Sequence, residues 1–223
     1  MTRRMILPLI FGILGTGILL SLGLWQMQRL DWKRAVIDEI EASIHAAPVA
    51  LPDRPDPARD RYLPVAVSGR TTGDEIHVLV SRKGVGAGFR IISAFETDDG
   101  RRIMIDRGFV REAARNQPRP ARPLDVVGNL HWPQDSDSYT PEPDAVRGFW
   151  FARDVPRMAE ALGTEPLLVI LREGAEDGIE PLPVDTSAIP NDHLNYAVTW
   201  FLLAAVWAGM TVFLLWRIRR GTD

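Results

Sequence analysis

The sequence predicts a membrane protein in which two transmembrane α-helices flank an exported, mostly-β domain of the α+β class. Three observations support this prediction. Two long runs without a formal charge lie near the two ends of the 223-residue chain. The segment between them holds all but one of the 29 acidic residues. Within that segment, short stretches alternate between apolar and polar residues, which is typical of strands in a small antiparallel barrel or sandwich.

The two uncharged runs are long enough to span a bilayer. Residues 5–27 and residues 194–216 each comprise 23 residues without Asp, Glu, Lys or Arg. A helix of that length rises about 35 Å, against a hydrocarbon core of about 30 Å. The first run could instead be a cleaved signal peptide. We interpret it as a retained anchor, because it is long for a signal peptide and ends in an aromatic and polar border without a small-residue cleavage motif.

Basic residues beside the spans predict their orientation. Two spans place both chain ends on one side of the membrane, so the basic residues of the two ends act together. These residues are Arg3, Arg4, Arg217, Arg219 and Arg220, against three basic residues just inside the central segment. Cytoplasmic flanks carry the excess of Lys and Arg. We therefore expect cytoplasmic termini and, in a bacterium, a periplasmic central domain anchored in the inner (plasma) membrane.

Helical periodicity continues past the first span and then stops. Val36, Ile37, Ile40 and Ile44 recur at helical spacing, which predicts a stalk that packs on its own domain, with a partner-binding helix as the alternative. Four prolines between residues 48 and 57 then form an extended linker. We divide the chain into residues 1–29 (cytoplasmic tip and first transmembrane helix), 30–60 (stalk and linker), 61–192 (exported β-rich domain) and 193–223 (second transmembrane helix and cytoplasmic tail).

The exported segment predicts about seven strands and one short helix. The Asp99-Gly100 dipeptide between two alternating stretches is a strong hairpin signal. The helix is predicted at residues 155–162, between the last two strands. The predicted strands are residues 62–67, 75–80, 89–95, 102–110, 124–132, 148–152 and 167–171.

Composition and motifs argue against several classes of function. The central segment is acidic overall, which argues against nucleic acid as a partner. The chain has no cysteine, which excludes disulfides and thiolate catalysis. The G-x-S-x-G, H-E-x-x-H and G-x-x-x-x-G-K motifs are absent from the sequence. Asp106 and Arg107 could form a catalytic pair, but we interpret them as a structural ion pair at a strand end. We predict that the protein is not an enzyme.

The outer end of the second span carries residues suited to haem. His193 lies at the predicted membrane boundary, Ala197 leaves room one turn deeper, and Trp200 follows about 10 Å below His193 on the same stripe. A neutral imidazole at an apolar boundary can ligate haem iron, while aromatic neighbours shelter the macrocycle. The alternative is an interfacial histidine that caps the span beside an aromatic belt. From these residues alone we favour the interfacial role.

Four segments together resemble the surfeit-locus family of cytochrome c oxidase assembly proteins. They are GLWQMQRLDWK at residues 23–33, YLPVAVSG at 62–69, IDRGFV at 105–110 and NDHLNYAVTWF at 191–201. The first and last segments are specific, and all four occur in the family's order. Phe109 stands where the family commonly has tryptophan, so this chain has no indole N–H at that position.

The resemblance implies an assembly factor that binds or relays haem a for insertion into the catalytic subunit of a haem–copper oxidase. It makes His193 the leading candidate for an axial ligand of the haem iron, with Ala197 and Trp200 beside the macrocycle. The implied partners are the cytochrome c oxidase catalytic subunit and, second, the haem a synthase, in addition to membrane lipid. The alternative is a scaffold protein for oxidase subunit assembly that does not itself bind haem.

Overall fold

The computed structural model describes residues 3–174, 178–187 and 189–220. It divides into two compact units, Met1–Glu39 with Thr186–Asp223, and Ile40–Asp185. The first unit is helical and the second holds the sheet. We describe each unit by itself.

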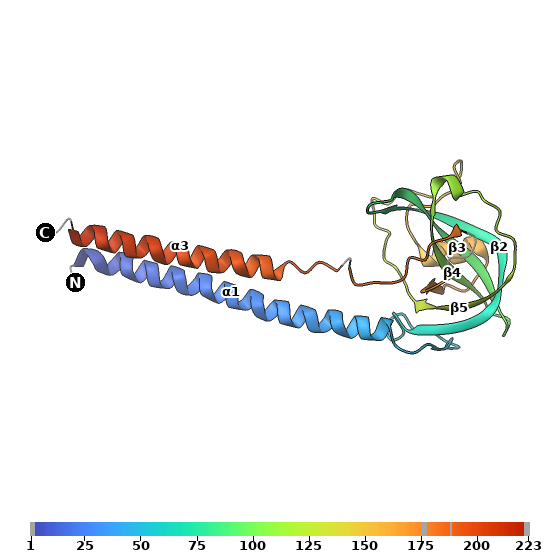
Figure 1. The fold of residues 1–223 in the computed structure, drawn as a ribbon, viewed down its shortest axis with the longest axis horizontal. Helices are drawn as coiled ribbons and strands as arrows, with labels where there is room; N and C mark the ends of the chain where they lie inside the picture. Colours follow the sequence, from blue (N-terminus) through green and yellow to red (C-terminus); the bar gives the residue numbers. More distant parts are fainter. Residues whose placement is uncertain (1–2, 175–177, 188, 221–223) are drawn as a thin grey trace. The chain divides into compact units, whose positions relative to one another are not determined.

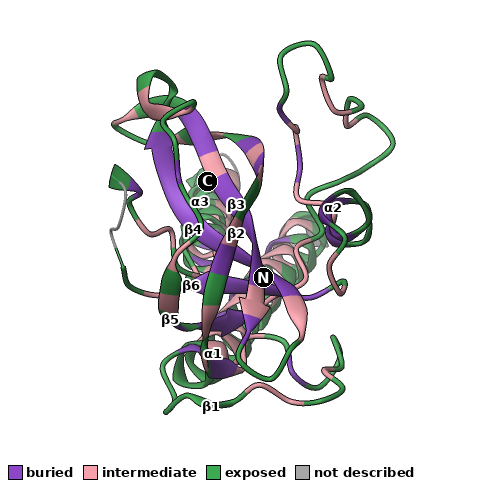
Figure 2. Ribbon diagram, turned by 90° about the vertical axis from the view of Figure 1, so that its right-hand side faces the viewer, coloured by how far each residue is buried: buried purple, intermediate pink, exposed green. Residues whose placement is uncertain are grey.

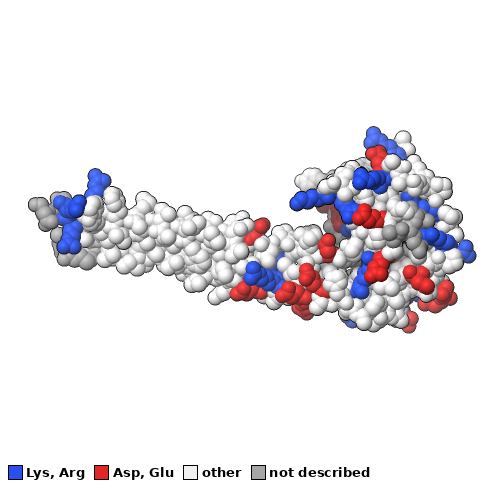
Figure 3. Space-filling model, in the orientation of Figure 1, with Lys and Arg blue, Asp and Glu red and all other residues white. Residues whose placement is uncertain are grey.

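Two long helices make up the first unit. Helix α1 (Arg3–Ile44) begins in this unit, and α3 (His193–Arg220) belongs to it entirely. Both helices are long and apolar enough to cross a membrane, and most of their large apolar side chains are exposed. Figure 1 shows them side by side, with the start of α1 and the end of α3 at the same end. In Figure 3 the visible face of the pair is uncharged over most of its length, and basic residues gather at that end. Both predicted spans are thus confirmed as apolar helices.

Glycines allow the two helices to approach closely. A Cβ atom at Gly15 would collide with the indole of Trp207, and one at Gly23 would collide with the ring of Phe201. The contacts have increasing residue numbers on α1 and decreasing residue numbers on α3. The two helices are therefore antiparallel. Ala204 of α3, between these two contacts, is buried. Small residues at such contacts let the backbones pack tightly where lipid offers no hydrophobic driving force for association.

The strands of the second unit form one sheet that closes on itself. Among the described residues the strand order is β1-β2-β3-β4-β6-β5, and β5 also pairs with β2. The alternating pattern predicted a small antiparallel barrel or sandwich, and this hydrogen-bonded circuit, which we call the barrel, agrees with that prediction. Its pairings are antiparallel except for β1 with β2 and β4 with β6. The strands are β1 (Val49–Ala50), β2 (Pro64–Arg82), β3 (Gly86–Thr97), β4 (Arg102–Arg111), β5 (Pro123–Leu130) and β6 (Leu168–Leu171).

The observed strands differ from the predicted ones in three places. Residues 62–67 and 75–80 were predicted as two strands, but both fall largely within the single strand β2. Strand β2 continues through an irregularity between Thr71 and Glu75, where Gly73 has a φ of 90° that other residues rarely adopt. The strand predicted at residues 148–152 is wrong, because Trp150 makes only an isolated bridge to Val78. The two-residue strand β1 was not predicted.

The apolar core lies inside the barrel and beneath the short helix α2 (Val155–Leu162), whose predicted bounds are confirmed. Every strand of the circuit contributes to the inner cluster, including Val65, Phe95, Ile105, Val126 and Val169. A second cluster joins the buried face of α2 to β2, β3, β4 and β6. A third comprises Phe89, Ile91, Val110, Phe149 and Ile179. Figure 2 shows the buried residues concentrated on these strands, whereas α1 and α3 are mainly exposed or half-buried.

Buried polar contacts hold residues 40–44, the part of α1 that lies in the second unit. Asn129 is fully buried and donates to the backbone oxygens of Ile44 at 3.0 Å and Tyr62 at 2.8 Å. Arg172 donates to the side-chain oxygen of Asn129 at 3.0 Å and also to the Ile44 oxygen. The last carbonyls of a helix have no partner within it. Asn129 of β5 and Arg172, which follows β6, therefore cap the last turn of α1 within this unit.

Candidate functional site

His193 is the first residue of α3, and its ring reaches the neighbouring helix. The ring nitrogen Nδ1 lies 2.8 Å from the amide oxygen Oε1 of Gln26, a residue of α1. Both side chains are half-buried. The structure thus brings together one residue from each of the two specific motifs, at residues 23–33 and 191–201.

This contact sets the chemistry of the imidazole. With the amide oxygen of Gln26 at this contact, Nδ1 carries the proton and donates the hydrogen bond, because an amide oxygen only accepts. In a neutral imidazole the other nitrogen, Nε2, then keeps its lone pair. In the described part of the chain, Nε2 of His193 makes no hydrogen bond. A neutral imidazole in this state can ligate a metal through Nε2.

The other two predicted site residues lie further along α3. Ala197 is 1% exposed, so its methyl group is covered within the helical unit. Trp200 is half-buried. Both share the side of the helix that carries His193, as the spacing predicted. Their contact with a macrocycle stays a prediction.

Gln26 was not predicted as a site residue. It lies 167 positions from His193 in the sequence, and no local pattern links the two. The available signal was weak: a polar amide in the last turn of an otherwise apolar run. On α1 it lies between the buried residues Gly23 and Leu30, on the face that spacings of three and four residues place together.

The histidines of the barrel unit have other roles. His131 stacks on Tyr62, with 5.2 Å between the ring centroids. Burial, and secondarily the positive charges of Arg153 and Arg61, lowers the pKa of His131 to about 4, so this ring is neutral at pH 7.

His77 lies 2.8 Å from Glu75, and Arg115 donates to its Nδ1 at 3.1 Å, so both ring nitrogens are engaged. No group of three or more His, Asp or Glu side chains able to hold a metal ion occurs within the described residues.

Asp106 forms a buried ion pair, but its partners are Arg90 and Arg153, and the ion pairs of the described residues do not include the predicted pair with Arg107. The Asp106 side chain is fully buried and lies 2.7 Å from Arg90 and 3.5 Å from Arg153. It also accepts a hydrogen bond from the backbone N–H of Gly108 at 3.1 Å. Arg153 is bound in turn by Asp135 at 2.7 Å. The charges thus compensate one another within the fold.

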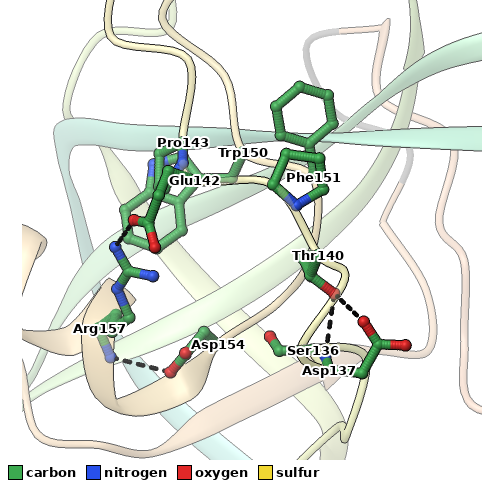
Figure 4. Close-up of a pocket in the computed structure, with 11 residues that line it drawn as sticks. Ser136, Asp137, Thr140, Glu142, Pro143, Trp150, Phe151, Asp154 and Arg157 are labelled. Atoms are coloured by element: carbon green, nitrogen blue, oxygen red, sulfur yellow. Dashed lines mark hydrogen bonds and ion pairs between the residues drawn. The ribbon is translucent and has the colours of Figure 1, made fainter.

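A small polar pocket of about 150 Å³ lies between the loop at residues 136–143 and the start of α2 (Figure 4). Arg157 donates to Glu142, and Asp154 caps α2 by accepting from the backbone N–H of Arg157. Thr140 donates to Asp137 at 3.0 Å. These polar side chains bond to one another, so we assign the pocket a role in holding the loop against α2.

Comparison with known proteins then classifies the chain. Residues 14–205 match the SURF1 family model, a range that includes both Gln26 and His193. The chain belongs to the SURF1 family. It is 31% identical over 211 residues to Surfeit locus protein 1 of Xenopus tropicalis and 30% identical over 211 residues to that of Homo sapiens. These matches cover 83% of this chain and 68% and 70% of the relatives.

A bacterial relative is also similar to this SURF1-family chain. The SURF1-like protein of Rickettsia bellii is 28% identical over 200 residues, which cover 84% of this chain and 82% of the relative. The resemblance inferred from the four motifs is therefore confirmed at the level of the family.

Proposed function

We propose that this protein is a membrane-anchored assembly factor for haem–copper cytochrome c oxidase, which binds haem a through His193 and passes it to the catalytic subunit. Membership of the SURF1 family supports the assembly role. The hydrogen bond from Nδ1 of His193 to Gln26, which leaves Nε2 available, is the observation that carries the haem role.

His193 and its contact with Gln26 have the chemistry expected of a histidine that ligates haem iron. Histidines that bind metals usually donate the second ring N–H to a carbonyl or carboxylate oxygen, and His193 does so. The apolar helix surface beside it suits a macrocycle that is mostly hydrocarbon. Bound haem a supplies the redox-active iron that the oxidase needs. The residues of this chain bind the group, orient it and keep it out of water, without covalent chemistry of their own.

We further propose that the termini are cytoplasmic and that the barrel faces the periplasm of a bacterial inner membrane. The last turn of α3 carries Arg217, Arg219 and Arg220, and such basic flanks favour the cytoplasmic side. Alkaline phosphatase and green fluorescent protein fusions after residue 140 and after residue 223 should report opposite compartments. Two fusions in the same compartment would exclude the two-span arrangement.

Deletion of the gene should lower the amount of assembled oxidase while haem a synthesis continues. The protein is proposed to act after synthesis, between the haem a synthase and the oxidase catalytic subunit. The measurement is the ratio of haem a in assembled oxidase to total cellular haem a, in deletion and parent strains without a second copy of the gene. The ratio should fall in the deletion strain and recover on complementation. An unchanged ratio with normal oxidase activity contradicts the assembly role.

The alternative is a scaffold that holds oxidase subunits without touching haem. A scaffold also predicts less assembled oxidase after deletion, so that measurement alone does not separate the two functions. The protein purified from cells that make haem a separates them. Haem a bound to the purified wild-type chain supports relay, and its absence favours the scaffold.

A further inference from the structure

We infer that Gln26 is a positioning residue that fixes the tautomer and direction of the His193 ring, so that Nε2 points to the haem iron. The inference rests on the proposed haem role of the same site. It goes beyond the proposed function because it assigns a role to a residue of α1, whereas His193 belongs to α3. The site is then built by the pairing of α1 with α3.

The packing of the helices holds Gln26 in place. Gly23, three residues before Gln26, packs against the Phe201 ring, where any side chain would collide with it. Leu30, four residues after Gln26, is 2% exposed. On α3, the buried residue Ala197 lies one turn after His193. The 2.8 Å contact between Gln26 and His193 is therefore bordered by tight packing on both helices.

The chemistry of the contact selects one tautomer. With the proton on Nδ1, the ring donates to Oε1 and both atoms are satisfied. With the proton on Nε2 and the Gln26 amide in the observed orientation, two lone pairs would face each other at 2.8 Å, which is repulsive. Beside apolar helices the difference matters more than in water, because a lower dielectric strengthens hydrogen bonds and raises the cost of unpaired groups.

Three substitutions separate this role from a general effect on the helices. Gln26→Leu removes the acceptor and puts an apolar side chain of similar size in its place. Gln26→Glu keeps an acceptor and strengthens it. The matched control is Gln28→Leu, because Gln28 is the same residue type on the same helix but is exposed. None of these changes introduces a residue that breaks a helix.

The tautomer is measured first, without haem. Full-length protein with ¹⁵N-labelled histidine in lipid nanodiscs gives ring ¹⁵N signals, and the His193 signal is the one lost in His193→Ala. The wild type and Gln28→Leu should carry the proton on Nδ1, whereas Gln26→Leu should shift the population toward Nε2. A wild-type proton on Nε2, or an unchanged tautomer in Gln26→Leu, overturns the inference.

Haem binding is measured second, by titrating haem a into the same preparations. Loss of a partner of a metal-bound histidine typically costs 10–100-fold in affinity, so Gln26→Leu should bind about 10–100-fold more weakly than wild type and Gln28→Leu. Gln26→Glu should retain binding and lower the midpoint potential of the haem, because a stronger acceptor makes the imidazole more basic.

The two measurements distinguish two failures. If the wild type binds no haem a, the proposed function fails, and the tautomer measurement still decides whether Gln26 orients His193. If the wild type binds haem a but Gln26→Leu matches it in affinity and in midpoint potential, the haem role stands and the positioning role of Gln26 is overturned.

Discussion

Replacing Asp106 with Ala should lower the free energy of unfolding of the barrel by about 3–5 kcal/mol. The Asp106 side chain is fully buried and is paired with Arg90 and Arg153, whose side chains are 15% and 14% exposed. Removing the carboxylate leaves two largely buried positive charges less compensated. It also removes the acceptor for the Gly108 N–H. Breaking one side of a buried ion pair costs more than the pair contributes to stability, because the remaining charge stays desolvated.

Pulse proteolysis of the full-length protein in detergent, over a series of urea concentrations, measures this loss. The control is Asp125→Ala, because Asp125 is exposed and its hydrogen bond to Ser68 lies at the surface. The control should change the free energy of unfolding by less than about 0.5 kcal/mol. If Asp106→Ala loses no more than Asp125→Ala, the buried cluster does not stabilise the fold as described.

Local patterns predicted those parts of the fold that depend on local interactions. Helix α2 was predicted at its observed bounds, since its apolar residues recur at helical spacing and a capping Asp154 and a left-handed Gly163 delimit it. The two membrane helices follow from their length and lack of charge. In both cases the information lies within a single stretch of sequence.

Pairings between distant segments were not predictable in the same way. Strand β2 continues through the irregularity near Gly73 because β3 pairs with it on both sides of that point. Residues near Trp150 alternate like a strand, yet they meet β2 at a single bridge. Arg119 lies in a loop rich in Arg and Pro but is buried, because Glu75, 44 positions away, pairs with it. Each outcome depends on register, which composition does not specify.

The candidate site also combines features that local sequence predicts with a contact between distant segments. A histidine beside an apolar run was visible in the sequence, and the spacing of Ala197 and Trp200 placed them on one side of the helix. The partner of His193 depends on the register of two antiparallel helices, which glycine contacts such as Gly23 with Phe201 determine. The motif resemblance indicated that residues 23–33 matter. Only the folded pair of helices indicates that Gln26 contacts His193.

The second large effect is expected from His193→Ala, which removes the proposed ligand of the haem iron. Haem a affinity should fall by more than the roughly 10–100-fold typical of losing a partner of such a ligand. Alanine is a good helix former, so α3 should persist and the protein level should not change. The matched control is His45→Ala, because His45 is exposed and lies in the barrel unit.

The most direct test is a spectroscopic titration of haem a into the purified, full-length apoprotein in nanodiscs. The wild type and His45→Ala should bind haem a and give the absorption spectrum of a histidine-ligated haem. His193→Ala should bind far more weakly and lose that spectrum. If His193→Ala keeps the affinity and the spectrum of the wild type, His193 is not the ligand and the proposed haem site is contradicted.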